Sequence, residues 1–199
     1  SGGALIGFLK GQGFRRLQGI DIDERAIEIC RQKGIADVHV GNAESTWFKD
    51  QQFDMIIASD ILEHIKDEDK ALREWNRILK KDGELLIFVP AFQFLWSRHD
   101  EVNHHYRRYS KSGLIGTLER NGFKVKRVSY WNFSLFLPVA LVRLSQTFLP
   151  SRRGSGDQLH EVNRFVNKTL ESILRFENMF LTGMSFPFGV SLFAIAGKI

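Results

Sequence analysis

The chain has 199 residues, of which 43% are hydrophobic and 26% are charged, so it can bury the core of one ordinary globular domain. Its 28 Lys and Arg residues against 23 Asp and Glu give a net charge of +5, but the excess is spread along the chain and does not indicate a nucleic-acid partner. Cys30 is the only cysteine, which excludes an internal disulfide and favours a reducing, cytoplasmic location.

Hydrophobic periodicity along the first 130 residues predicts strands that alternate with helices. Helices are expected at residues 3–12, 23–33, 66–81 and 111–120, and strands at 16–20, 36–40, 53–58, 84–89 and 123–130. Asp23 is placed to cap the second helix, and the basic residues before Gly83 are typical of the end of the third. This alternation is typical of an α/β fold with a parallel, doubly wound sheet.

The pattern changes after Trp131. An apolar run, a polar linker, a long helix and a last apolar strand are expected at residues 133–149, 150–156, 159–180 and 189–197. We interpret residues 133–183 as a helical insertion before a final antiparallel strand, all within one domain over residues 1–199.

The chain opens with a glycine turn, Gly2 and Gly3, that leads directly into a helix. Glycine turns of this kind normally follow a strand. We therefore expect that the intact protein begins further upstream and that the first strand of the sheet is missing from this sequence.

Acidic residues stand at the ends of two predicted strands. Asp21 follows the strand at residues 16–20, and Asp60 follows the strand at residues 53–58. Open α/β sheets bind their ligands at the carboxyl ends of the strands, so the two acids indicate a nucleotide-like cofactor across that edge. The Asp21 carboxylate can accept hydrogen bonds from both ribose hydroxyls. The alternative is that Asp21 caps the next helix, but Asp23 is better placed for that role.

Four short segments, in order, identify a family resemblance: GIDID at 19–23, GNAE at 41–44, SDILEH at 59–64 and ILKKDG at 78–83. Together they resemble class I S-adenosylmethionine-dependent methyltransferases of the type 11 group. The resemblance covers residues 1 to about 130 and returns at the last strand. It implies a Rossmann-like fold and S-adenosylmethionine as the cofactor. The sequence departs from the family pattern at its start, where only Ser1, Gly2 and Gly3 correspond to the family's glycine-rich motif.

The resemblance also implies which residues bind the cofactor. Gly2 and Gly3 would let the backbone approach it closely, and Ile22 would lie against the adenine. The full expected set is Gly2, Gly3, Asp21, Ile22, Asn42, Ala43, Glu44, Ser59 and Asp60. Asn42, Ala43 and Glu44 would meet the adenine edge, whereas Ser59 and Asp60 would lie near the methionine end. The alternative for Asn42, Ala43 and Glu44 is that they form only a polar turn. The alternative for Asp60 is that it caps a helix.

The loop at residues 99–109 is the expected source of catalytic groups, because methyl transfer to oxygen or nitrogen needs a base and a positioned acceptor. We predict His105, Tyr106 and Arg107 for these tasks. The alternative is that the arginines pair with surface acids while the tyrosines pack. His99, Asp100, His104 and His105 have a spacing that suggests metal ligands, but adjacent histidines do not easily face one ion, so no metal is predicted.

The substrate is expected to be a small molecule, partly apolar or lipid-linked, because the insertion is apolar. At 17 residues the run at 133–149 is too short to span a bilayer, and we expect it to form a lid helix packed on the core. The alternatives are a hydrophobic pocket wall and peripheral membrane contact, with Arg143 at a lipid head group. Two alternative functions stay open. An acid ~19 residues after a glycine turn also fits an NAD(P)-dependent oxidoreductase. The second is a non-catalytic methyltransferase-like binding protein.

Overall fold

The computed structural model describes residues 2–148 and 164–199. The α-helices are α1 Ala4–Gly11, α2 Glu24–Gln32, α3 Glu68–Ile78, α4 Arg98–Val102, α5 Lys111–Arg120, α6 Phe136–Phe148 and α7 Arg164–Leu181. The strands are β1 Gly19–Asp21, β2 Val38–Val40, β3 Phe53–Ser59, β4 Leu79–Pro90, β5 Phe123–Trp131 and β6 Ser191–Lys198. Two short 3-10 helices follow β3 and β4: η1 Leu62–His64 and η2 Gln93–Leu95.

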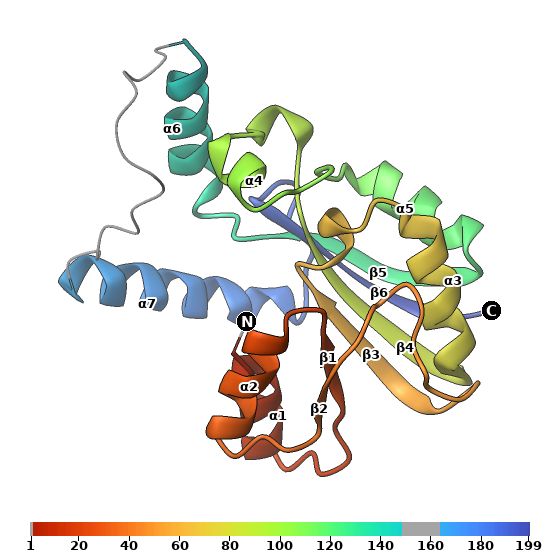
Figure 1. Cartoon of the computed structure of the whole chain (residues 1–199). Helices are drawn as coiled ribbons and strands as arrows, with labels where there is room; N and C mark the ends of the chain where they lie inside the picture. The colour runs from red at the N-terminus through yellow and green to blue at the C-terminus, as the bar shows by residue number, and fades with distance from the viewer. Residues whose placement is uncertain (1, 149–163) are drawn as a thin grey trace.

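The strands form two sheets rather than one (Figure 1). Strands β1 and β2 pair in parallel, and a four-stranded sheet has the order β3-β4-β6-β5. Within it β3 and β4 are parallel, and β6 is antiparallel to both of its neighbours, as predicted for the last strand. The α/β fold class is confirmed. The side chains of Gln18 and Gln52 meet at 3.3 Å where the two sheets lie side by side. A strand upstream of the sequence stays a prediction.

The main core lies between the four-stranded sheet and helices α3 and α5. Leu72 and Trp75 of α3 and Leu118 of α5 are buried there. A hydrogen bond links the two helices: the side-chain amide of Asn121, at the end of α5, donates to Oδ1 of Asp69 in α3 at 2.5 Å. This core positions the carboxyl ends of β3 and β4.

The N-terminal unit of α1, α2, β1 and β2 has a small core of its own. Ile27, Cys30, Ile35 and Val38 are buried together, and Ile6 of α1 packs against them. A core of this size stabilises less than the main one, because the stabilisation follows the buried apolar area.

The predicted end of the third helix was wrong. We expected a helix to residue 81 and a glycine stop, but the helix ends at Ile78 and Leu79 begins β4. Leu79 is paired with Phe53 of β3, and a Cβ on Gly83 would lie 3.2 Å from the Asp54 carbonyl oxygen. Strand pairing and close backbone approach therefore replace the local preference for a helix end.

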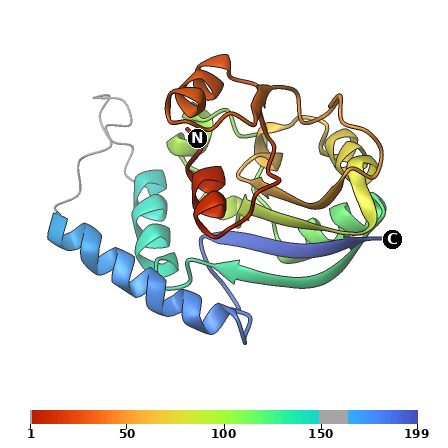
Figure 2. The same cartoon turned by 90° about the horizontal axis from the view of Figure 1, so that it is seen from below.

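The insertion before the last strand is confirmed in its described part: α6 and α7 follow β5 and precede β6 in the chain, and both lie to one side of the four-stranded sheet (Figure 2). The buried Glu177 of α7 accepts hydrogen bonds from the backbone N–H groups of Phe133 and Ser134, at 2.8 and 2.9 Å, and thereby holds the segment that leads into α6. The predicted linker at 150–156 and the predicted start of the long helix at 159 lie outside the described residues. Within the described ranges, every helix is too short or too polar to cross a bilayer.

Candidate functional site

The first predicted cofactor residues lie at the carboxyl end of β1. Asp21 is the last residue of the strand, and its Oδ1 accepts a hydrogen bond from the Asp23 N–H at 3.0 Å. Asp23 caps α2 by accepting from the Arg25 N–H at 2.9 Å, as predicted. The two acids therefore have different roles. Ile22 stands beside them with 75% of its surface exposed, which is a large open apolar surface at a strand end.

The loop after β2 is held by its own polar groups. Asn42 Oδ1 accepts from the Glu44 N–H at 2.8 Å, and the Ala43 carbonyl accepts from the Trp75 indole N–H at 2.9 Å. Trp75 belongs to the buried face of α3, so this loop connects the end of β2 to the main core. Glu44 also lines a hollow of about 590 Å³ beside the start of α3. The contact of these residues with adenine stays a prediction.

Strand β3 ends in a strained turn. Asp60 has a φ of 52°, in the left-handed region that non-glycine residues rarely adopt. Ser59 Oγ donates to Asp60 Oδ2 at 3.0 Å, and the Asp60 N–H donates to the Phe88 carbonyl at 3.1 Å. Strained backbone conformations are common at functional sites, and this one lies where the chain turns at the predicted cofactor edge.

The glycine turn before α1 has a packing role. Gly2 and Gly3 have positive φ values of 55° and 77°. A Cβ on Gly3 would lie 2.6 Å from Ile35 Cδ1 and 2.9 Å from Cys30 Sγ, so only glycine lets α1 approach the small core this closely. The close approach of this turn to a cofactor stays a prediction.

A cavity of about 330 Å³ lies beyond the ends of β3 and β4. Its walls come from η1, the segment from α4 to the following loop, α6 and the residues that lead into β6. The ionisable residues that line it are Asp60, Glu63, His64, His99, His105, Arg108 and Arg143. The cavity therefore begins at Asp60, the last residue of the predicted cofactor edge, and reaches the insertion.

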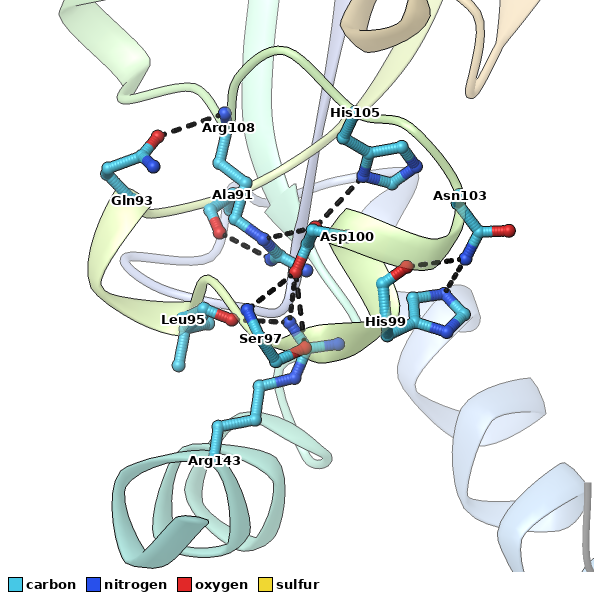
Figure 3. A network of polar contacts seen from close by, with 10 residues as sticks. All are labelled: Ala91, Gln93, Leu95, Ser97, His99, Asp100, Asn103, His105, Arg108 and Arg143. Carbon is cyan, nitrogen blue, oxygen red and sulfur yellow. Dashed lines mark hydrogen bonds and ion pairs between the residues drawn. The ribbon is translucent and has the colours of Figure 1, made fainter. Parts of the chain in front are cut away.

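Asp100 is the centre of a buried ionic network beside this cavity (Figure 3). Its side chain has no exposed surface and pairs with Arg108 Nε at 2.8 Å and with Arg143 Nη1 at 3.5 Å. It also accepts from the Ser97 N–H at 2.9 Å in the capping box that starts α4. Burial acts to raise the pKa of Asp100, but the hydrogen bond and charge of Arg108 outweigh it and hold that pKa below its usual range. Asp100 is therefore a fixed anion.

Two histidines meet in the cavity. His105 Nδ1 hydrogen-bonds to Asp100 Oδ1 at 2.9 Å, which fixes the ring and directs its other nitrogen away from Asp100. The His64 ring packs edge-on against it, with 4.5 Å between ring centroids. Burial lowers the pKa of His64 and the neighbouring His105 lowers it further, so His64 is neutral near pH 7.

Glu63 is the most unusual residue of the cavity. It is 1% exposed, and within the described residues neither oxygen of its carboxylate has a hydrogen-bond partner. Burial raises its pKa from the usual 4.5 to about 8. Buried polar groups are almost always satisfied in proteins, so a carboxylate of this kind calls for a proton, a ligand or a cation.

The three predicted catalytic residues lie in different places. His105 lines the cavity, whereas Tyr106 is 54% exposed. Arg107 turns away: its Nη1 pairs with Glu68 at 2.8 Å and its Nη2 donates to the Lys66 carbonyl at 2.7 Å, at the edge of the larger hollow. The structure therefore groups His105 with neither of its predicted partners, and their catalytic roles stay predictions.

Besides Asp60 and His105, the ionisable residues in or beside the cavity were not predicted as site residues: Glu63, His64, His99, Asp100, Arg108 and Arg143. A signal for Asp100 exists, because Ser97 and Asp100 have the spacing of a capping box. Arg108 cannot be told from Arg107 by its neighbours in the chain. Arg143, considered in the sequence as a contact for lipid head groups, donates from Nη1 to the Leu95 carbonyl at 2.5 Å and faces Asp100, and membrane contact stays a prediction. The four residues considered as metal ligands in the sequence, His99, Asp100, His104 and His105, do not form a metal site together, because arginines bind the Asp100 carboxylate.

Comparison with known proteins finds similarity to methyltransferases. A family model described as a methyltransferase domain matches residues 1–87. An uncharacterized methyltransferase of Bacillus subtilis is 30% identical over 135 residues, which cover 59% of this chain and 52% of that protein. An uncharacterized protein of Methanocaldococcus jannaschii is 31% identical over 134 residues, 67% of this chain and 54% of that protein. The chain thus spans about half the length of the curated relatives it matches.

A solved structure shares the fold. The crystal structure of a SAM-dependent methyltransferase from Archaeoglobus fulgidus superposes with a TM-score of 0.63 at 21% identity, over 99% of this chain and 82% of that one. At this identity the likeness shows the fold alone. Taken with the match of residues 1–87 to a methyltransferase domain, it confirms the resemblance to class I S-adenosylmethionine-dependent methyltransferases found in the sequence.

Proposed function

We propose that this protein transfers a methyl group from S-adenosylmethionine to a small acceptor bound in the cavity beside Asp100. The observation that carries the proposal is the position of Asp60, which ends the predicted cofactor edge at β3 and also lines the cavity. A methyl donor along that edge would face an acceptor in the cavity. The domain match over residues 1–87 supports the same activity.

The residues at the strand ends suit this cofactor in their chemistry. When bound, S-adenosylmethionine supplies an electrophilic methyl group on a sulfonium. Asp21 offers a carboxylate for the ribose hydroxyls, and the exposed Ile22 offers an apolar surface for the adenine. Ser59 and Asp60 offer oxygen acceptors for the methionine amino group.

His105 is the strongest candidate for activating the acceptor. An oxygen or nitrogen nucleophile loses a proton when it is methylated, and a positioned base assists that step. Asp100 holds Nδ1 of His105, so the other ring nitrogen is the one that can take the proton. Arg108, locked to Asp100 and to the Ala91 carbonyl at 3.0 Å, keeps this arrangement rigid. Rigid positioning is the main contribution that a methyltransferase needs from its protein.

We further propose that the acceptor is partly apolar. Phe136 of α6 packs against Phe92 and Phe94, with ring centroids at 5.5 and 6.3 Å, so the insertion brings aromatic surface next to the η2 segment. Leu137 and Leu141 of α6 are 64% and 61% exposed, which suits a lipid-linked acceptor or peripheral contact of residues 133–149 with a membrane. Cosedimentation with anionic vesicles tests that contact, and Leu141→Glu should abolish it.

Calorimetric titration of S-adenosylhomocysteine into the protein tests the activity class, with NAD(H) as the parallel titrant. Binding of S-adenosylhomocysteine alone, in the micromolar range, is the expected result. Binding of NAD(H) alone would favour the oxidoreductase alternative instead. If the folded, full-length protein binds neither, the methyltransferase proposal fails and the non-catalytic alternative takes its place.

A further inference from the structure

The unpartnered carboxylate of Glu63 points to a ligand. Both of its oxygens are buried without a hydrogen-bond partner in the part of the chain that the structure describes. An unpaired buried carboxylate is costly, because it loses water without replacing it. The residue lies in η1, immediately after the strained turn at Asp60, and faces the cavity rather than the apolar core.

Two imidazoles complete a donor set around it. One ligand atom from each of Glu63, His64 and His105 can be chosen so that all three lie within 4.8 Å of one another. Tetrahedral Zn²⁺ with bonds of about 2.0–2.1 Å holds its ligand atoms about 3.4 Å apart, so the three side chains need to close by roughly an ångström. Two histidines and one carboxylate are a common ligand set for zinc with an open fourth position.

The surroundings of His105 match those of a metal ligand. Histidines that bind metals usually donate their second ring nitrogen to a carboxylate, which fixes the ring and its tautomer. Asp100 holds Nδ1 of His105 at 2.9 Å in this way, and Arg108 and Ser97 hold Asp100 in turn. The arrangement leaves Nε2 of His105 for a ligand in the cavity.

We propose that Glu63, His64 and His105 form a binding site for a divalent first-row cation, with Zn²⁺ as the best match, and that Asp100 positions His105 within it. The charges nearby are compatible with a cation. Asp60 and Asp100 add negative charge, and the positive charges of Arg108 and Arg143 are both directed at Asp100. The neutral state of His64 near pH 7 is the state that binds metals.

The cation site lies in the acceptor cavity, but the evidence for it does not rest on methyl transfer. If a cation is bound there, it lowers the pKa of an acceptor hydroxyl group, and it occupies the His105 nitrogen that would otherwise take the proton. The inference therefore changes how the acceptor is activated. It does not change which cofactor is used.

The test is calorimetric titration of ZnSO₄ into chelator-treated, full-chain protein, with Mg²⁺ as a second titrant and elemental analysis of the dialysed complex. We expect one Zn²⁺ per chain, bound in the micromolar range or tighter, and weak or no Mg²⁺ binding. Glu63→Gln and His105→Ala should each weaken Zn²⁺ at least tenfold, and Asp100→Asn should weaken it about 10- to 100-fold. Visible absorption of the Co²⁺-substituted protein should show tetrahedral coordination that Glu63→Gln removes.

His104→Asn is the matched control. His104 is an exposed imidazole next to His105, outside the three-residue set, and asparagine tolerates its φ of 55°. It should leave Zn²⁺ affinity unchanged. Lack of stoichiometric Zn²⁺ binding to the folded wild-type protein overturns the proposal without any variant, as does binding that His104→Asn removes and Glu63→Gln does not. Titration of S-adenosylhomocysteine into the same sample separates this outcome from failure of the proposed function.

Discussion

The two halves of the molecule hold their polar site residues in opposite ways. In the β1–β2 unit, Asp21 and Asn42 accept hydrogen bonds from backbone groups two residues away and stay partly open to solvent. Beside the four-stranded sheet, Asp100 has no exposed surface and is bound by two arginines and a histidine. The first arrangement can exchange local contacts for a ligand at little cost to stability. The second is part of the core, so its residues determine stability and function together.

Asp100→Ala should have the largest effect, because it removes the partner of the buried Arg108 and of the partly buried Arg143. Removal of one partner from a buried ion pair costs about 3–5 kcal/mol, so the free energy of unfolding should fall by about that amount in urea titrations. Asp54→Ala is the control, because the Asp54 side chain is 80% exposed in its pair with Lys80. It should leave the urea midpoint unchanged. Equal midpoints for the two variants would mean that the buried network does not stabilise the fold.

Glu63 should make stability depend on pH. The pKa of Glu63 in the folded protein is about 8, above the usual 4.5, so folding takes up a proton between these values. Stability is then fully present below about pH 4.5 and falls by about 1.4 kcal/mol per pH unit as pH rises toward 8. Thermal melts in chelating buffer from pH 5 to 8 measure this decline. Glu63→Gln, which stays neutral, should flatten that dependence, and an unchanged slope would assign it to other groups.

Asp21→Ala should separate cofactor binding from stability. Loss of two hydrogen bonds to a charged acceptor should weaken S-adenosylhomocysteine by ~2–3 kcal/mol, or roughly 30- to 150-fold by calorimetry, with the unfolding free energy nearly unchanged. Asp23→Ala is the matched control on the same loop. It removes the cap of α2 and should cost about 1 kcal/mol of stability with affinity retained. Unchanged affinity in Asp21→Ala would show that the cofactor edge has been misplaced.

The parts of the fold that local chemistry determines were predictable from the sequence. The cap at Asp23, the helix at residues 111–120 and the strand that begins at Phe53 all agree with the structure, because their signals lie within a few residues of the chain. The helix end at residues 79–83 was not predictable in this way. There the pairing of Leu79 with β3, a contact across 26 residues, overrides the local signal.

The acceptor cavity depends on packing that no local pattern encodes. Tyr106 N–H donates to the Glu63 carbonyl at 2.7 Å, and this contact lays the loop after α4 over η1. That placement buries Glu63 and brings His105 to His64. It also decides that Arg108 faces inward while its neighbour pairs with Glu68. The sequence could therefore predict that the loop at 99–109 is functional, but it could not predict which of its residues face the cavity.

The smallest effect is expected from Glu177→Ala in the insertion, where burial and local bonding combine. Glu177 is 5% exposed and accepts from the backbone N–H groups of Phe133 and Ser134, so its loss should cost roughly 1–2 kcal/mol. Faster amide hydrogen exchange in residues 133–148, with β4 unchanged, would locate the effect. Glu171→Ala in the same helix removes only an exposed pair with Arg175 and should cost at most ~0.5 kcal/mol. If both variants leave hydrogen exchange in α6 unaltered, α7 does not hold the start of α6. The position of α6 beside the acceptor cavity must then be fixed by Arg143, which contacts Asp100 from the cavity side.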